Sequence, residues 1–281
     1  MNRTRRPRMR IIAEQRDLAG LRGCVLVPTM GALHAGHTAL IRRAVEAARG
    51  ARPVVVWIFV NPTQFNEQAD FQRYPRTLSP DVGLCEAAGA DAVFAPSVDE
   101  VYPPGGAAIT PAPPAQAEMG LEDRFRPGHF AGVCQVVRRM FDMTRPTAAV
   151  FGEKDWQQLQ VVRAMTAQDK LGVEIVAHPT VREPDGLAMS SRNRFLDRDQ
   201  RSRAGAAARA LCEGAGASTA GDAEGVMRGI LEGSGLAVEY AEVREPESLA
   251  RVEPGWRGPG RALIAARLGS VRLIDNAPWP G

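Results

Sequence analysis

The 281-residue sequence lacks the cysteine pattern of a metal-binding or disulfide-stabilised domain. Its four cysteines are scattered, with no C-x-x-C pair and none close to the histidine pair described below: Cys24, Cys85, Cys134 and Cys212. Widely spaced single cysteines are typical of buried, reduced thiols. We therefore expect a cytoplasmic protein without a cysteine metal site.

Long hydrophobic runs are also missing. The longest unbroken apolar run is Val54–Val60, far shorter than the roughly 20 residues that span a bilayer. No apolar stretch follows the N-terminal arginines, so we expect a basic tail rather than a signal peptide: Arg3, Arg5, Arg6, Arg8 and Arg10. The net charge of +3 gives no reason to expect a nucleic-acid partner.

Three well-known motifs are absent. The chain has no G-x-x-x-x-G-K-[ST], no G-x-G-x-x-G after its first predicted strand, and no H-E-x-x-H. These absences argue against a P-loop enzyme, a dinucleotide-dependent dehydrogenase and a zinc protease. No paired acids and no nucleophile beside a base stand out. Chemistry would then depend on positioning and charge stabilisation, as in phosphoryl or nucleotidyl transfer.

What the sequence does contain is a glycine-bearing stretch, Pro28–His37, between an apolar strand (Val25–Val27) and a helical pattern. Strand, turn and helix in this order point free backbone N–H groups and the positive end of a helix dipole at an anion. His34 and His37 are three residues apart and would share a helix face, within reach of one phosphate. The alternative is one structural histidine and one exposed histidine.

Two further strand ends bear polar residues. The run Val54–Val60 is typical of a central parallel strand and ends in the turn Asn61–Phe65, which contains Gln64. The strand Ala148–Phe151 ends at Gly152–Asp155, before a helix expected from Trp156. A lysine at a helix N-terminus is unfavourable, so Lys154 suggests a neighbouring anion. Ligands of open α/β sheets bind at this strand edge.

Two other patterns are less specific. Ser79 and Pro80 fit the N-cap and first position of a helix. Arg124, Arg126 and His129 form either a solvated basic loop or part of an anion pocket, and the sequence leaves both open.

The regular alternation of predicted strands and helices ends near residue 184. Val181–Gly186 is typical of a hinge or turn, and Met189–Asn193 contains two serines beside an arginine, a good clamp for phosphate oxygens. Helices (200–213, 223–233) and strands (238–243, 263–267, 271–274) follow without the earlier alternation. We expect an α/β protein: a Rossmann-like doubly wound parallel sheet in residues 1–183 and a smaller α+β lid domain in residues 184–281.

Several stretches together resemble the pantothenate synthetase (pantoate–β-alanine ligase) family of the nucleotidylyltransferase superfamily. They are Val27–His37, Ile58–Phe65, Tyr74–Thr77, Arg126–Gly132, Phe151–Gln158, Asp185–Asn193 and Leu273–Asn276. The resemblance implies an ATP-dependent ligase of pantothenate biosynthesis, on the route to coenzyme A. Pantoate and ATP would give pantoyl adenylate and pyrophosphate, and β-alanine would then release AMP and form the amide.

The resemblance also implies roles for individual residues. His37 would be a proton donor, with His34 and Lys154 as further catalytic groups. Gln64 and Gln158 would hold pantoate, with Gln64 also near β-alanine. ATP would contact the following residues: Met30, Gly31, Ala32, Leu33, His34, Ala35, Gly36, His37, Gly152, Glu153, Lys154, Asp155, Val181, Met189, Ser190, Ser191 and Arg192. Mg²⁺ would accompany ATP without an assigned protein ligand, and the protein would be a homodimer.

Three positions depart from the family pattern. Thr63 stands where methionine is usual, Trp156 where phenylalanine or tyrosine is usual, and Pro80 where an acidic residue is common. The proline weakens any expectation of an acidic pair for magnesium beside Asp81. Neutral glutamines at the pantoate site have a physical rationale: a salt bridge would stabilise the attacking carboxylate in its ground state without accelerating the reaction.

Two other functions remain as alternatives. A transferase moving AMP to a phosphorylated acceptor would require more basic residues where Gln64 and Gln158 stand. A catalytically silent nucleotide-binding module would be indicated by loss of His37 or Lys154, and both are present.

Overall fold

The computed structural model describes residues 9–66, 68–105 and 110–281, which form two compact units. Unit 1 contains the chain up to Pro114 together with Pro127–Gly152 and Val161–His178. Unit 2 contains Ala115–Arg126, Glu153–Gln160 and Pro179–Gly281. Two short segments that precede residue 184 thus belong with the C-terminal part. The division at residue 183 into a Rossmann-like domain that binds ATP and pantoate and a smaller lid domain stays a prediction.

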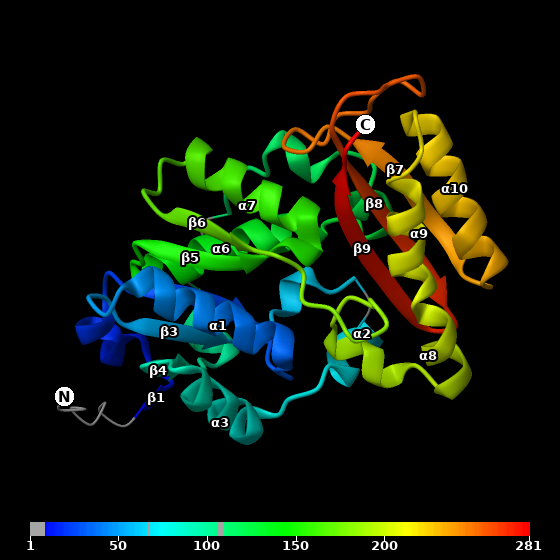
Figure 1. Cartoon of the computed structure of the whole chain (residues 1–281). Helices are drawn as coiled ribbons and strands as arrows, with labels where there is room; N and C mark the ends of the chain where they lie inside the picture. The colour runs from blue at the N-terminus through cyan, green and yellow to red at the C-terminus, as the bar shows by residue number, and fades with distance from the viewer. Residues whose placement is uncertain (1–8, 67, 106–109) are drawn as a thin grey trace, which may run out of the picture. The chain divides into compact units, whose positions relative to one another are not determined.

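Unit 1 is built on a six-stranded parallel sheet with strand order β1-β4-β3-β2-β5-β6 (Figure 1). The strands are β1 (Arg10–Ile12), β2 (Val25–Thr29), β3 (Val54–Ile58), β4 (Ala92–Phe94), β5 (Ala148–Gly152) and β6 (Glu174–His178). The sheet confirms the expected doubly wound architecture. The edge strand β1 was not anticipated, because only Ile12 in it is buried. Arg10 therefore starts a strand, whereas Arg3, Arg5, Arg6 and Arg8 lie outside the described residues.

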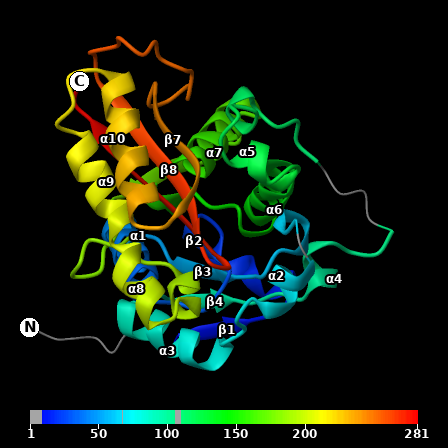
Figure 2. The same ribbon diagram turned by 90° about the vertical axis from the view of Figure 1, so that its right-hand side faces the viewer.

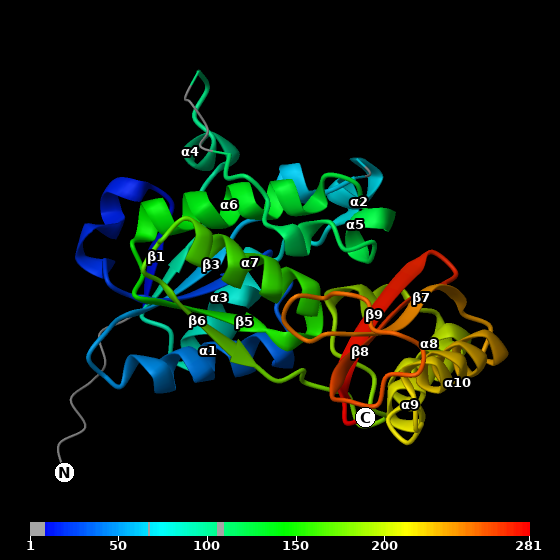
Figure 3. The ribbon, with the colours of Figure 1, turned by 90° about the horizontal axis from the view of Figure 1, so that it is seen from above.

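Helices cover both faces of this sheet, and α1 and α6 lie on opposite sides of it (Figure 3). The unit's helices are α1 (Ala35–Ala48), α2 (Gln68–Arg73), α3 (Leu78–Ala88), α4 (Val98–Val101), α6 (His129–Thr144) and most of α7 (Trp156–Gln168). On one face, Ile41 of α1 and Cys85 of α3 pack against alternate strand residues such as Val27 and Val56.

The strand order fixes where a ligand site belongs. From β2 the chain proceeds in one direction through β3 and β4, and then returns to β5 and β6 on the other side of β2. Right-handed crossovers in opposite directions place their helices on opposite faces. The loops after Thr29 and Gly152 therefore leave the sheet at its topological switch point, where open α/β sheets bind ligands.

Among the helix and strand boundaries that differ from expectation, three belong to unit 1 near the predicted site residues. Helix α1 begins at Ala35 rather than near His37, because His34 is its N-cap. Helix α3 begins at Leu78 with Thr77 at the N-cap, so Pro80 occupies the third helical position. Proline is tolerated there because first-turn N–H groups have no intrahelical partner. Strand β3 ends at Ile58 rather than Val60.

Unit 2 contains an antiparallel sheet in the order β7-β8-β9, with α9 and α10 side by side against it (Figure 2). Its strands and helices are β7 (Ala237–Arg244), β8 (Gly260–Leu268), β9 (Val271–Trp279), α5 (Glu122–Phe125), α8 (Arg198–Ala204), α9 (Ala206–Gly214) and α10 (Ala220–Gly233). The helix expected over 200–213 is divided at Gly205, and α8 begins with a capping box between Asp197 and Gln200. In the part of the chain that the structure describes, no helix is long and apolar enough to cross a membrane.

Candidate active site

The residues predicted to form the site fall into two groups, one in each unit. Unit 1 contains Met30–His37, Gln64 and Gly152, and unit 2 contains Glu153, Lys154, Asp155, Gln158, Val181 and Met189–Arg192.

His34 and His37 form a pair of tilted rings, 45° apart in plane, at the start of α1. Their ring centroids are 4.1 Å apart. The Nδ1 atom of His34 accepts from the Gly36 N–H at 3.2 Å, and the Nδ1 atom of His37 accepts from the His34 N–H at 3.3 Å. Since both Nδ1 atoms accept, each neutral ring carries its proton on Nε2. The pair thus forms two Nε2–H donors on one short segment.

The loop between β2 and α1 is held by the protein itself. The N–H groups of Ala32 and Leu33 donate to the Asp81 carboxylate, each at 2.9 Å, and the Gly31 N–H donates to the Thr29 hydroxyl at 3.3 Å. The expectation of free backbone N–H groups is wrong for these three residues, and for His34 and Gly36 as well. An anion at this loop would therefore meet the histidine rings rather than these backbone N–H groups.

Gln64 lies in the 3₁₀ turn Pro62–Gln64 after β3. Its Nε2 donates to the Met30 sulfur at 3.0 Å, and its Oε1 accepts from the Asn61 amide at 3.1 Å. These contacts bring Gln64 and the histidine loop together at the carboxyl edge of the sheet. The buried Asn61 organises the turn, since its Oδ1 accepts from the Thr63 N–H at 3.3 Å and the Tyr102 hydroxyl at 2.9 Å. Sequence reasoning treated Asn61 as an ordinary turn residue.

Helix α6 packs directly against this turn. A Cβ at Gly132 would lie 2.3 Å from the Thr63 carbonyl oxygen, so only glycine fits there. The buried His129 ring, at the start of α6, contacts the Gln64 carbonyl through Nδ1 at 2.9 Å. His129 therefore supports the Gln64 backbone and does not belong to a solvated loop, while its part in an anion pocket stays a prediction.

In unit 2, Asn276 of β9 anchors the segment after β5. Its Nδ2 donates to the carbonyls of Glu153 and Lys154 at 2.9 and 2.8 Å, and its Oδ1 accepts from Arg261 at 2.7 Å. The backbone around Lys154 is thus fixed by one buried amide. The Lys154 ammonium lies 3.8 Å from the Asp155 carboxylate. Asp155 therefore supplies an anion beside the lysine, and the helix-dipole argument alone does not require a ligand.

Arg261 contacts two residues of this segment. Its guanidinium lies 3.6 Å from the centroid of the Trp156 ring and 3.2 Å from a Glu153 carboxylate oxygen. The Trp156 indole N–H donates to the Pro246 carbonyl at 2.8 Å. The unusual tryptophan thus provides a broad face for a buried cation, a contact worth about 1–2 kcal/mol when desolvated.

The two adjacent glutamines of α7 have different surroundings. The Gln157 amide is fully engaged, since it accepts from the Glu122 N–H and donates to the Gln116 carbonyl and the Asp123 carboxylate, each at 2.9 Å. Gln158 makes none of these contacts and is half-buried. The pantoate contact expected for Gln158 stays a prediction.

A small hairpin brings Val181 and Met189 together. The Met189 N–H donates to the Val181 carbonyl at 3.0 Å, and Arg182 and Ala188 form a bridge between them. Arg182 fixes the hairpin to β9 through two hydrogen bonds to Asp275, at 2.6 and 3.0 Å. The predicted adenine contact and the predicted phosphate-binding serines therefore belong to one anchored segment of unit 2.

The serine–arginine turn is internally organised. The Ser190 hydroxyl oxygen accepts from the Arg192 N–H at 3.2 Å, and Ser191 is buried.

Burial lowers the pKa of Arg126, and the charges of Arg192 and Arg272 lower it further against the opposing effect of Glu122. Arg126 is half-buried and its guanidinium lies 3.6 Å from a Glu122 carboxylate oxygen, so it does not belong to a solvated loop. A role for Arg126 in an anion pocket stays a prediction.

Glu122, at the start of α5, sits in a dense polar network. Arg272 binds its carboxylate in a bidentate pair at 2.6 and 2.7 Å, and the Tyr240 hydroxyl donates to it at 2.7 Å. Burial by itself would raise the pKa of Glu122, but the hydrogen bonds and charge of Arg272 lower it to about 2. This acid therefore stays ionised and serves structure rather than proton transfer.

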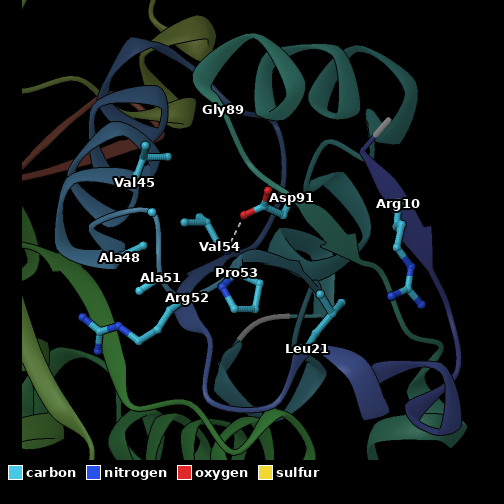
Figure 4. Close-up of a pocket in the computed structure, with 11 residues that line it drawn as sticks. Arg10, Leu21, Val45, Ala48, Ala51, Arg52, Pro53, Val54, Gly89 and Asp91 are labelled. Carbon is cyan, nitrogen blue, oxygen red and sulfur yellow. Dashed lines mark hydrogen bonds between the residues drawn. The ribbon is translucent and has the colours of Figure 1, made fainter. Parts of the chain in front are cut away.

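One cavity and three buried thiols lie apart from these groups. A cavity of about 480 Å³ opens at the amino ends of β1 and β3, opposite the switch point (Figure 4). Its Arg52 donates to the Thr147 hydroxyl at 2.9 Å, and its Asp91 accepts from the Val54 N–H at 2.8 Å.

Burial raises the pKa of three thiols to about 12, which leaves them unreactive: Cys24, Cys85 and Cys134.

Comparison with known proteins gives a consistent result. The family model for pantoate-beta-alanine ligase matches residues 3–278. A pantothenate synthetase of a Bradyrhizobium species (strain BTAi1) is 47% identical over 285 residues, which cover 98% of this chain and 99% of the relative. One from a Nocardioides species is 49% identical over 262 residues, covering 90% of this chain and 78% of the relative.

Solved structures agree. A pantothenate synthetase from Thermus thermophilus superposes with a TM-score of 0.89 at 39% identity, covering 97% of this chain and all of that one. A pantoate-beta-alanine ligase from Francisella tularensis, complexed with beta-gamma ATP and beta-alanine, has a TM-score of 0.76 at 30% identity, covering 96% and 97% of the two chains. The chain belongs to the pantoate–β-alanine ligase family and is a ligase of that family.

Proposed function

We propose that this ligase works in two steps through an acyl adenylate. A pantoate carboxylate oxygen attacks the α-phosphorus of ATP, and the bond to the bridging oxygen breaks to release pyrophosphate. The amine of β-alanine then attacks the acyl carbon, AMP leaves, and the nitrogen loses its extra proton to give the amide. The observation that carries this proposal is the His34–His37 pair, two Nε2–H donors on one short segment at the switch point of the sheet.

In the first step, charge develops on the phosphate oxygens. His37 donates through Nε2–H to these oxygens, His34 supports it from the adjacent position, and Lys154 balances the growing negative charge. Donors that are already oriented stabilise such charge without reorganising during the reaction. The Asn276 anchor on the Lys154 backbone and the cap hydrogen bonds of the two histidines provide that orientation.

The other predicted residues bind the substrates. Val181 meets the adenine through its backbone, while Met189, Ser190, Ser191 and Arg192 hold the triphosphate, and Met30–His37 and Gly152–Asp155 complete the ATP contacts. Gln64 and Gln158 orient pantoate through neutral amides, with Gln64 also near β-alanine. Residues 184–281 act as a lid domain. The hydrogen bond from the Met189 N–H to the Val181 carbonyl places both residues in one hairpin, which supports their assignment to ATP binding.

We propose that Mg²⁺ enters the site bound to ATP rather than at a metal site formed by the described residues. Among them, no group of three histidine, cysteine or acidic side chains is placed to hold a metal ion. Both Asp81 oxygens already accept hydrogen bonds. Mg²⁺ commonly binds through substrate phosphates with one or two carboxylates, so the phosphates of ATP would supply most of its ligands. When bound, the ion would neutralise phosphate charge.

Two further proposals concern the protein's location in the cell and its oligomeric state. We place it in the cytoplasm, because the structure gives all four cysteines as free thiols. We also propose a homodimer, as the family resemblance implies, which sedimentation velocity would test.

The decisive experiment measures pyrophosphate release from ATP and Mg²⁺ with and without pantoate, and then with β-alanine. Release that requires pantoate, followed by multiple turnovers to AMP when β-alanine is added, is the expected result. Release only with a phosphorylated acceptor would identify an AMP transferase instead. ATP binding without release under any of these conditions would identify a silent nucleotide-binding module.

A further inference from the structure

Asp81 is an almost fully buried carboxylate at the start of α3, with an exposed fraction of 2%. Its Oδ1 accepts from the Leu33 N–H at 2.9 Å, and its Oδ2 accepts from the Ala32 N–H at 2.9 Å and the Thr77 hydroxyl at 3.1 Å. A carboxylate that receives two consecutive backbone N–H groups fixes both the position and the orientation of that backbone. The backbone concerned leads directly into the His34–His37 pair.

The loop needs this support because its conformation is unfavourable. Gly31 and Ala32 both have positive φ, at +81° and +52°. A non-glycine residue is strained in the left-handed region, so surrounding contacts must hold Ala32 there. A Cβ at position 31 would lie 3.2 Å from Asp81 Oδ2. Glycine at position 31 thus allows the carboxylate to approach the loop closely.

The loop conformation in turn sets the histidine rings. Leu33, whose N–H is bound by Asp81, immediately precedes the N-cap His34, and the His34 N–H donates to the His37 ring. A rotation of the 32–33 peptide would therefore move the donor that selects the His37 tautomer. We propose that Asp81 is a positioning residue, which holds the Gly31–Leu33 turn so that His34 and His37 both present Nε2–H. The consequence for catalysis rests on the proposed function of the two histidines.

The first test compares two carboxylates that each accept backbone N–H groups in unit 1. Asp81→Asn replaces one acceptor oxygen with an NH₂ group that faces a backbone donor, whereas Asp91→Asn makes the same change at the Val54 N–H, at the other end of the sheet. We expect kcat/KM for ATP to fall about 10- to 100-fold for Asp81→Asn, the loss of roughly one or two charge-assisted hydrogen bonds. For Asp91→Asn we expect less than a twofold change, although both variants lose thermal stability.

The second test needs no activity. The chain has four histidines, so long-range ¹H–¹⁵N spectra of the ligand-free protein resolve each ring tautomer. We expect Asp81→Asn to move the His34 and His37 signals away from the Nε2–H pattern while those of His178 stay unchanged. If Asp81→Asn does not fold, Thr77→Val, which removes only the hydroxyl hydrogen bond, should cause a smaller shift of the same two rings.

Three outcomes would overturn the proposal. Unchanged His34 and His37 tautomers in a folded Asp81→Asn protein would show that the loop keeps its shape without the carboxylate. Recovery of full activity at high Mg²⁺ concentration would identify Asp81 as a metal ligand instead. Equal losses of kcat/KM in Asp81→Asn and Asp91→Asn would show a general stability effect. An altered tautomer pattern with undiminished activity would uphold the positioning role and contradict the catalytic role of the histidines.

Discussion

The Asn276 side chain donates a hydrogen bond of 2.8 Å to the backbone carbonyl of Lys154. The same amide nitrogen bonds the Glu153 carbonyl, and the neighbouring Asp275 holds Arg182 of the hairpin that contains Val181 and Met189. Two consecutive residues of β9 thus anchor two segments of unit 2 that we assign to ATP binding. Neither residue needs to touch ATP for its loss to reduce activity.

Replacing Asn276 with alanine should separate this anchoring role from substrate contact. The change leaves the carbonyls of Glu153 and Lys154 without their partner, at a cost of about 1–3 kcal/mol for each buried group. We expect KM for ATP to rise about tenfold, KM for β-alanine to change little, and the melting temperature to fall. Arg267→Gln, which removes a half-exposed ion pair on β8 in the same sheet, is the control and should leave both KM values unchanged. Equal increases in the two KM values for Asn276→Ala would contradict the anchoring role.

Gly132 offers a way to move Gln64 without altering it. In Gly132→Ala, the new methyl group would overlap the Thr63 carbonyl oxygen, so the turn that bears Gln64 must shift. Overpacking of this kind costs about 1–3 kcal/mol of stability. We expect KM for pantoate to rise at least fivefold in steady-state assays. Gly83→Ala in α3, where nothing lies within 4 Å of the added Cβ, should retain wild-type kinetics. A Gly132→Ala enzyme with unaltered pantoate affinity would show that Gln64 does not bind pantoate from this turn.

Gln64 itself gives a sharper test. Gln64→Ala removes the amide that lies between Met30 and Asn61. We expect pantoate binding to weaken about 10-fold or more while KM for ATP stays nearly constant, because a neutral amide orients pantoate and not the nucleotide. Isothermal titration with each substrate separates the two affinities. A comparable loss for ATP and pantoate would refute this assignment.

The sequence predicted the parallel sheet and the positions of the loops because buried β-branched runs and glycine-bearing strand ends are local signals. Asn61 and Asp81 were not assigned their roles, since their partners Tyr102 and Leu33 lie 41 and 48 residues away in the chain. Asn276 and Glu153 are 123 residues apart. Periodicity cannot reveal such contacts. They depend on side chains that meet only after the sheet has formed, and these long-range polar contacts fix the site's backbone.

The Glu122–Arg272 pair predicts a pH dependence of stability. The pKa of Glu122 is about 2 in the folded protein against 4.5 for the free side chain. Because the folded value is the lower one, the stabilisation is complete above pH 4.5 and disappears as the pH falls through about 2. At 1.36 kcal/mol per pKa unit it amounts to about 3 kcal/mol. Urea unfolding from pH 5 to pH 2.5 should show Glu122→Gln as the less stable protein, with the gap to wild type closing at low pH. A gap that does not vary with pH would contradict the charge-based explanation.

The adjacent glutamines of α7 form a natural matched pair. Gln157 binds Gln116, Glu122 and Asp123 through its amide, whereas Gln158 makes none of these contacts. Gln157→Ala leaves buried partners unsatisfied, so we expect it to lower the melting temperature by several degrees while kcat/KM stays within about threefold of wild type. Gln158→Ala should keep the melting temperature and lose about 10-fold or more in kcat/KM for pantoate. Calorimetry and steady-state kinetics on both variants give the comparison. The reverse pattern, with Gln157 governing pantoate and Gln158 governing stability, would assign the pantoate contact to the other face of the helix.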